Sequence, residues 1–346
     1  MSFIDSSIPH QVEMILGLPG LGETELLSKA REMGAPILIS ANSLSRWKKV
    51  RGIREWDGFN PAPLANADGM RVRLDSAGFV AMVKYNGFPW SIEDYVHLAA
   101  SHPFELWSAM DYCVEEEIAG TQALVEDRIS RTVAANVQCR RLARRYGIEN
   151  TFMPVIQGRA PKDYLRCIDR LPLIEDHKVI GVGSMCRRHV HGPNGILAVI
   201  SAIDRKLAGT DIKLHLFGLK SQGAEAVRAH PRVASVDSQA YGTAARWDAL
   251  HAGHSKTNAF LAGVMESWMG RQRVRLAKPG FQFQDTLPLV EPAPPPMTRW
   301  QRCELQAREE LRELVEEGEL DHDMYLERMV YELAGEIYSN GGHLDA

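Results

Sequence analysis

The sequence predicts an α/β protein built as a TIM (β/α)8 barrel with a C-terminal helical appendage and no zinc ribbon. Short apolar runs alternate with helical stretches along most of the chain, which is typical of parallel strands covered by helices. Five of these runs end at a polar residue or a glycine, as expected where strand ends form the rim of a barrel. The 346 residues are also enough for one barrel of about 250 residues and an appendage.

The elements can be placed in order along the chain. The first strand is expected over residues 12–16, followed by a turn over 17–24, a helix over 25–33 and a strand over 35–40. The turn lacks the Gly-Lys-Ser/Thr ending of a phosphate loop, so it is interpreted as a plain strand-to-helix connection. Further helices are expected over residues 92–100, 114–146, 165–170, 195–207 and 223–229. The five strand ends lie at Asp75, Asp111, Gln157, Gly181 and Asp237.

A proline-rich stretch divides the chain near its C-terminal end. Residues 292–296 read Pro-Ala-Pro-Pro-Pro, which forms a stiff break. We therefore expect a barrel domain over residues 1–291 and a second segment over 292–346. Residues 300–337 are charged with helical periodicity, which predicts two helices packed on the side of the barrel.

Composition narrows the class of protein. A hydrophobic share of 45% with 24% charged residues is ordinary for a soluble globular protein. No signal-like leader and no apolar run of 18 residues is seen, so neither secretion nor a membrane partner is expected. Five widely spaced cysteines favour a reducing compartment. The net charge of −4 argues against a protein that coats polyanions generally, but it permits a local basic groove.

Six short motifs occur in a distinctive order over roughly residues 70–240. They read Asp75-Ser76-Ala77-Gly78-Phe79, Asp111-Tyr112-Cys113, Ile156-Gln157-Gly158, Gly181-Val182-Gly183, Leu216-Phe217-Gly218 and Val236-Asp237-Ser238. In order and content they resemble the tRNA-guanine transglycosylase superfamily, whose members are barrel enzymes. Each motif alone is weak, whereas the ordered set is fairly specific.

One departure from the superfamily points to a particular branch. The tRNA enzymes carry a Cys-x-Cys-x-x-Cys cluster with a later His after the nucleophile strand, which binds tetrahedral zinc. Here the cysteines are dispersed, and of the five only Cys303 follows Asp237. We therefore expect no metal, and no cofactor follows from the motifs. The chain is more similar to the DpdA-type 7-deazaguanine DNA transglycosylases of phages and bacteria, which implies a cytoplasmic location in a bacterium or a phage-infected host cell.

The resemblance assigns roles to the strand-end residues. It implies that Asp237 is the nucleophile that attacks the sugar and that Asp75 is the general acid and base. Asp111 matches the aspartate that accepts from N1–H and the exocyclic amine of a guanine-like base. Gln157 would donate to O6, helped by backbone N–H groups around Gly181 and Gly183. Val182 interrupts the family's glycine pair, so the backbone donor is left open.

Aromatic and basic residues supply further candidates. Phe79 and Phe217 match the positions that sandwich the base, and the alternative is that both are ordinary core residues. Arg187 and Arg188 follow the Gly181 strand end, where they either bind phosphate or lie on the surface. Other basic residues gather at 46–54, 140–145 and 271–278.

The function implied is the exchange of guanine in DNA for a 7-deazaguanine, in the 7-cyano form (preQ0) or a derivative. The resemblance also implies a phage setting, in which such a modification would serve the evasion of restriction. The partners would be DNA, the 7-deazaguanine base and, if required, helper proteins. A base in a duplex cannot reach two carboxylates on a barrel rim, so flipping or a locally open strand is implied. Two alternatives remain, a zinc-free tRNA transglycosylase and a non-catalytic subunit that binds nucleic acid.

Overall fold

A computed structural model describes residues 11–22, 24–172, 174–251, 253, 255–279, 298–316 and 327–340. The predicted proline-rich break at 292–296 lies outside these residues. The boundary between residues 291 and 292 therefore stays a prediction.

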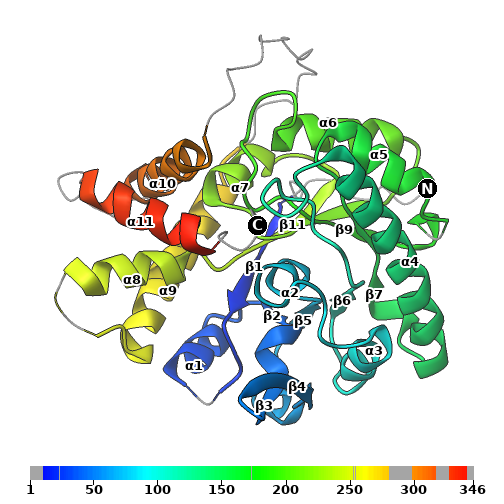
Figure 1. Cartoon of the computed structure of the whole chain (residues 1–346), viewed down its shortest axis with the longest axis horizontal. Helices are drawn as coiled ribbons and strands as arrows, with labels where there is room; N and C mark the ends of the chain where they lie inside the picture. Colours follow the sequence, from blue (N-terminus) through cyan, green and yellow to red (C-terminus); the bar gives the residue numbers. More distant parts are fainter. Residues whose placement is uncertain are drawn as a thin grey trace, which may run out of the picture.

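The predicted parallel barrel is confirmed (Figure 1). In the described part of the chain, one sheet has the order β7-β6-β5-β2-β1-β11-β10-β9-β8, and all of its paired strands run parallel. Its strands are β1 (Glu13–Leu18), β2 (Ile37–Ser40), β5 (Val72–Asp75), β6 (Leu106–Ser108), β7 (Phe152–Met153), β8 (Val155–Ile156), β9 (Val179–Val182), β10 (Lys213–Leu216) and β11 (Val233–Ser238).

Pro154 explains why the two end strands of this sheet are neighbours in the sequence. β7 pairs with β6 and β8 pairs with β9, so the segment 152–156 bonds to both edges of the sheet. Proline has no N–H to donate to a strand ladder, which divides the segment into β7 and β8. Its carbonyl still accepts from Gly181 N at 2.7 Å. The two halves therefore act as one interrupted strand, and the barrel closes with eight strand positions.

Helices follow most strands and cover the barrel. Their starts carry recognisable capping residues: Thr24, Ser91, Thr121 and Thr257 each accept a backbone N–H of the first turn. The helices are α1 (Glu25–Glu32), α2 (Gly78–Tyr85), α3 (Ile92–Ala100), α4 (Gln122–Tyr146), α5 (Pro161–Asp169), α6 (Ile196–Lys206), α7 (Ser221–Val227), α8 (Tyr241–His251) and α9 (Asn258–Leu276).

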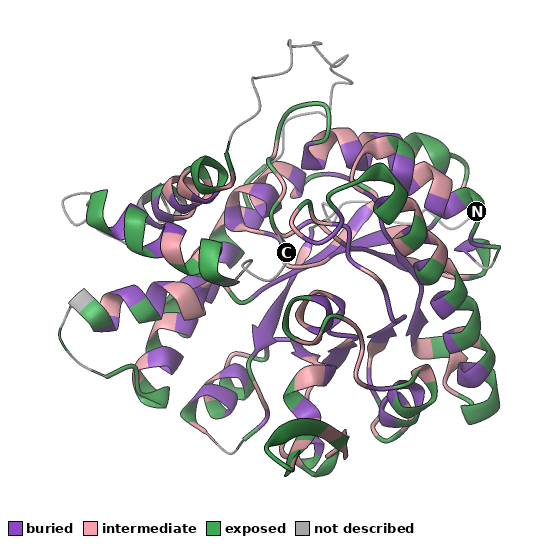
Figure 2. Ribbon diagram, in the orientation of Figure 1, coloured by how far each residue is buried: buried purple, intermediate pink, exposed green. Residues whose placement is uncertain are grey.

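The segment between β2 and β5 departs from this alternation. Two short 3-10 turns flank an antiparallel hairpin of β3 (Ser45–Val50) and β4 (Ile53–Phe59) where a covering helix would otherwise lie. The large apolar residues of this segment, among them Trp, Ile and Phe, do not recur every three or four residues as they would on the buried face of a helix. The hairpin is largely exposed, in contrast to the buried barrel strands (Figure 2).

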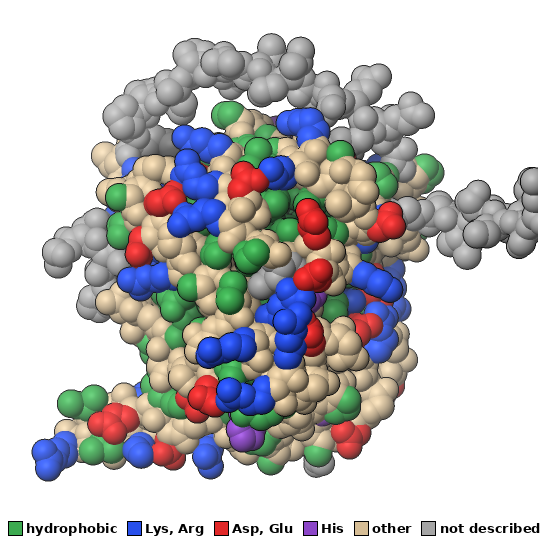
Figure 3. Space-filling model, turned by 90° about the vertical axis from the view of Figure 1, so that its right-hand side faces the viewer, with side chains coloured by type: hydrophobic (Ala, Val, Ile, Leu, Met, Phe, Trp, Pro, Cys, Tyr) green, Lys and Arg blue, Asp and Glu red, His purple; other side chains and the backbone are tan. Residues whose placement is uncertain are grey.

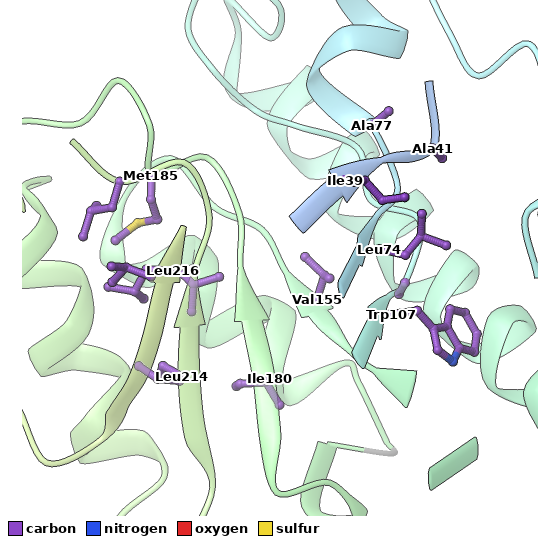
Figure 4. Close-up of a cluster of buried hydrophobic side chains, with 14 of the residues drawn as sticks. Ile39, Ala41, Leu74, Ala77, Trp107, Val155, Ile180, Met185, Leu214 and Leu216 are labelled. Atoms are coloured by element: carbon purple, nitrogen blue, oxygen red, sulfur yellow. The ribbon is translucent and has the colours of Figure 1, made fainter. Parts of the chain in front are cut away.

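The main core lies between the barrel wall and the helices. Ile39, Leu74 and Trp107 lie in register on β2, β5 and β6, and all three are buried (Figure 4). Burial of such side chains contributes about 1.5–3 kcal/mol each relative to exposure. This layer fixes the strands whose ends carry the candidate site.

The C-terminal segment forms the predicted appendage. α10 (Arg299–Glu316) and α11 (Glu327–Asn340) pack on each other and bury a second apolar cluster. Ala244 and Trp247 of α8 belong to the same cluster, so the two helices attach to the barrel through α8. The expectation of two helices on the side of the barrel is confirmed.

Candidate active site

Successive side chains of a strand lie on alternate faces, and several polar side chains of the barrel strands face the barrel interior. Arg73 and Asp75 lie two residues apart on β5, as do Ser235 and Asp237 on β11, so each pair shares a face. Arg73 Nη1 donates to Ser235 Oγ at 2.9 Å, which shows that this shared face is the interior. Asp75 and Asp237 are the outermost members at the carboxyl ends. The two carboxylates therefore meet across the barrel mouth, although 162 residues separate them.

Asp75 is held by the turn that follows β5. Its Oδ2 accepts from Ala77 N at 3.0 Å, and Ala77 adopts a left-handed conformation with φ of 67°. Such a conformation favours glycine, so the turn holds Ala77 under backbone strain. Burial, reinforced by the nearby charges of Asp111 and Asp237, raises the pKa of Asp75 to about 7. A carboxyl group with that pKa can both donate and accept a proton near neutrality.

Asp237 has a different environment. Its Oδ1 accepts from Gly218 N at 2.9 Å and lies 3.3 Å from His215 Nε2. Its side chain is about 10% exposed. The Gly218 N–H fixes the position of this oxygen, and the His215 ring stands beside it. The second oxygen remains for an incoming group.

His215 is a residue that the sequence analysis missed. It lies in the middle of β10, fully buried, and burial lowers its pKa. Because Arg73 donates to Ser235 Oγ, the Ser235 hydroxyl proton is directed at His215 Nδ1, 2.9 Å away. The remaining proton of a neutral imidazole then lies on Nε2, which faces Asp237. The only signal in the sequence was a histidine inside an apolar strand.

Asp111 and Gln157 are in direct contact. Gln157 Nε2 donates to Asp111 Oδ2, and Ser76 Oγ donates to Asp111 Oδ1 at 2.8 Å. Each carboxylate oxygen keeps a second lone pair for a ligand, and the Gln157 amide keeps a second N–H. Burial raises the pKa of Asp111. The sequence placed these two residues on the same rim, and the structure brings them together.

Two further polar residues complete this network. Ser184 Oγ lies 2.8 Å from Gln157 Oε1 and 3.0 Å from Glu115 Oε2. Burial raises the pKa of Glu115, and the single Ser184 hydroxyl proton can be donated to Gln157 Oε1 or to Glu115 Oε2. The donation to Asp111 fixes which end of the Gln157 amide carries the N–H groups. Neither residue was singled out from the sequence.

Gly181 and Gly183 have a steric role that differs from the expected one. Their N–H groups donate to the carbonyls of Pro154 and Ile156, at 2.7 and 3.0 Å, within the barrel wall. These two N–H groups are therefore engaged in the sheet, and a backbone donor to the base near them stays a prediction. A Cβ at Gly181 would lie 2.5 Å from the Phe217 ring, and one at Gly183 would lie 2.1 Å from Gln157 Nε2. Glycine at both positions makes room for side chains at the mouth.

The two candidate aromatic residues lie in different surroundings. Phe217 is half-buried and packs edge-on against His215, with ring centroids 4.7 Å apart. It therefore stands beside the Asp237 end of the barrel mouth. Phe79, at the start of α2, has the Arg187 guanidinium 5.0 Å above its ring. Both rings are partly accessible, as a stacking role would require.

The two candidate phosphate-binding arginines are engaged within the protein. Arg188 donates to the carbonyls of Gly158, Arg159 and Asn194, and also to that of Ser184 and to the Tyr164 hydroxyl. It clamps the loop after β9, and its phosphate role stays a prediction. Arg187 pairs with Glu117 and stacks on Phe79, with about a third of its side chain exposed.

Three other kinds of feature could indicate function in the described residues: a metal-binding group, a second cavity and a membrane-spanning helix. Within the described residues, no group of three or more His, Cys, Asp or Glu side chains could hold a metal ion. A cavity of about 500 Å³ between α8 and α9 lies away from the strand ends, and Asp248 is the single carboxylate on its wall. Among the described helices, none is both long and apolar enough to cross a bilayer.

The comparisons with known proteins agree with the strand-end motifs. No curated protein matches the chain. The model of the family described as DpdA, DeoxyPurine in DNA protein A, matches residues 21–315. That match covers the described barrel strands after β1, both carboxylates at the mouth and most of α10. The chain therefore belongs to the DpdA family, and this membership implies a transglycosylase-like role in the modification of deoxypurines in DNA.

Proposed function

We propose that this protein exchanges guanine in DNA for a 7-deazaguanine by double displacement. The observation that carries the proposal is the pair of unlike carboxyl groups at the barrel mouth. The pKa of Asp75 is raised to about 7, whereas Asp237 accepts a backbone N–H and faces the buried His215. Groups whose environments differ in this way suit an acid–base role and a nucleophilic role, respectively.

In the first step, an oxygen of Asp237 attacks C1′ of the target deoxyguanosine. The bond from C1′ to the base breaks as Asp75 donates its proton to the leaving guanine, and an ester joins Asp237 to the sugar. In the second step, the ionised Asp75 takes a proton from the incoming deazaguanine. The deprotonated nitrogen of the deazaguanine then attacks C1′ and displaces the Asp237 carboxylate. Two displacements at C1′ retain its configuration.

The base would be read by the network around Asp111. A guanine edge presents N1–H and the exocyclic amine to an acceptor, which matches the free lone pairs of Asp111. The second N–H of Gln157 is suited to O6. Phe217, beside the Asp237 end of the mouth, can stack on the base, and Phe79 is the candidate for its other face. Gly181 and Gly183, which carry no Cβ, keep side-chain bulk away from the mouth, as entry of a flipped nucleotide would require.

The test is nucleoside mass spectrometry of DNA and tRNA from cells that express the protein and are supplied with 7-cyano-7-deazaguanine. We expect a deazaguanine deoxynucleoside in DNA, and none with Asp237→Ala or Asp75→Ala. The matched control is Asp248→Ala, which changes a carboxylate on α8 away from the mouth. A modified nucleoside in tRNA and none in DNA would overturn the substrate assignment.

A further inference from the structure

We propose that the β3–β4 hairpin is a DNA-binding arm that enters the major groove of duplex DNA beside the target base. This proposal rests on the proposed function, because base exchange in DNA would place duplex DNA at the carboxyl ends of the barrel strands. The hairpin leaves the barrel directly after β2 and Ser40, whose side chain lies beside Asp75. It therefore belongs to the same rim as the candidate active site.

The base of the arm is rigidly anchored. Trp47 packs on Tyr85 of α2 with ring centroids 4.6 Å apart, and Trp56 packs on the buried Trp90 at 6.1 Å. Tyr85 Oη donates to Asn42 just before the hairpin, at 3.0 Å. Aromatic pairs of this kind add about 0.5–1.5 kcal/mol beyond their burial. The direction of the arm is thus set by the barrel rather than by a loose loop.

The outer half of the arm has no such packing. Residues 48–55 are exposed apart from the half-buried Val50, and the arm stands out from the body at the lower left of Figure 3. Its tip is the two-residue turn Arg51-Gly52, with φ of 50° and 85°. Positive φ at both positions is the tight hairpin turn that keeps two strands in register. Beside it, the Ile53 side chain is 68% exposed.

Charge indicates the partner. The hairpin holds five basic and two acidic side chains in a protein whose net charge is −4. Both acids face bases of the hairpin itself: Lys48 Nζ is 2.9 Å from Asp57, and Glu55 lies opposite Lys48. Among the described residues, Lys49 and Arg51 have no acidic partner. Arg54, opposite Lys49, stacks on Trp47 and adds a third such cation among the described residues, so the ribbon is suited to a polyanion.

The shape of the hairpin, a two-stranded β-ribbon, favours duplex DNA over other polyanions. The major groove of B-form DNA admits a two-stranded β-ribbon, whereas that of A-form RNA is too narrow. In the groove, Lys49 and Arg51 would contact phosphates and Ile53 would contact base edges such as the thymine methyl. The tip lies about 13 Å from Trp47 along the strand. Trp47 packs on the last residue of α2, and the length of α2 separates that residue from the site by about 12 Å. The contact would therefore fall within about seven base pairs of the exchanged base.

The first experiment measures DNA binding against salt concentration. Lys49→Ala with Arg51→Ala should weaken binding to a 30-base-pair duplex about tenfold and lower the salt slope by about two units. Ile53→Ser should weaken binding without changing the slope. Arg141→Ala with Arg145→Ala, which removes two exposed charges at the far end of α4, is the matched control and should change neither. An unchanged slope in the hairpin variant, or an equal loss in the control or on an RNA duplex, would overturn the proposal.

The second experiment separates the arm from the chemistry. Base exchange is measured on duplexes with three or fifteen base pairs on each side of the target. Wild-type protein should have a lower KM on the long duplex, and the Lys49/Arg51 variant should lose this difference with kcat retained. Equal KM values for wild type and variant on the long duplex would refute the arm. If wild type binds through the hairpin but exchanges no base, the arm stands and the proposed function fails.

Discussion

The raised pKa of Asp75 makes the stability of this protein depend on pH in a way that one substitution should abolish. Asp75→Asn keeps the shape of the side chain, and its amide oxygen can still accept from Ala77 N. The substitution removes a buried group that ionises beside Asp111 and Asp237. The variant should therefore escape the destabilisation that ionisation of Asp75 causes in the wild type.

The magnitude follows from the difference between the folded and unfolded states. The pKa of Asp75 is about 7 when folded, against an ordinary value of 3.8. Between pH 3.8 and pH 7 the Asp75 carboxyl group is protonated in the folded state but ionised in the unfolded state. Its contribution to the free energy of unfolding is therefore complete below pH 4 and is lost as the pH rises through 7. At 1.36 kcal/mol per unit, the loss between pH 5 and pH 8 is about 2–3 kcal/mol.

The assay is urea denaturation of wild type and Asp75→Asn at pH 5 and pH 8. The difference in unfolding free energy between the two proteins should shift by about 2–3 kcal/mol in favour of the variant at pH 8. Asp211→Asn, which replaces an exposed carboxylate just before β10, serves as the control and should leave the difference between the two pH values unchanged. A difference that is the same at both pH values would refute the raised pKa of Asp75, and with it the argument for its acid–base role.

Four further predictions test the rest of the site. Asp237→Asn should abolish both base exchange and the covalent protein–DNA adduct on denaturing gels, and an adduct that persists would remove Asp237 as nucleophile. Asp111→Ala should raise the KM for the deazaguanine, by an amount equivalent to roughly 2–3 kcal/mol of recognition, without altering the salt dependence of DNA binding. Arg188→Ala should lower the melting temperature by several degrees, because five contacts of its guanidinium are lost, and a reduced salt slope at full stability would instead restore its phosphate role. Elemental analysis should find no stoichiometric zinc, and one zinc per chain would contradict the interpretation of the dispersed cysteines.

Local pattern was enough to predict the barrel and the residues at its mouth. A strand places alternate side chains on opposite faces, so an apolar run that ends in Asp75 or Asp237 indicates both a buried strand and a polar rim residue. The same reasoning placed Asp111 and Gln157 at strand ends. Helical periodicity likewise predicted α10 and α11, since it depends only on neighbours within a few turns.

Contacts between distant segments decided the remaining features. His215 faces Asp237 because β10 and β11 are paired, and its tautomer depends on Arg73 from the opposite wall of the barrel. Whether Arg188 is available to a ligand depends on carbonyls supplied by other loops. Gly181 and Gly183 are required by side chains that approach from neighbouring strands.

The sequence by itself thus determined which residues lie at strand ends, because that property is set by the local alternation of apolar and polar side chains. It also showed that basic residues gather at 46–54. Only the tertiary structure decided that these residues form a projecting ribbon, because its direction is set by Trp47 on Tyr85 and Trp56 on Trp90. The pKa of Asp75 was likewise decided by closure of the barrel, which brings Asp75, Asp111 and Asp237 together at one mouth.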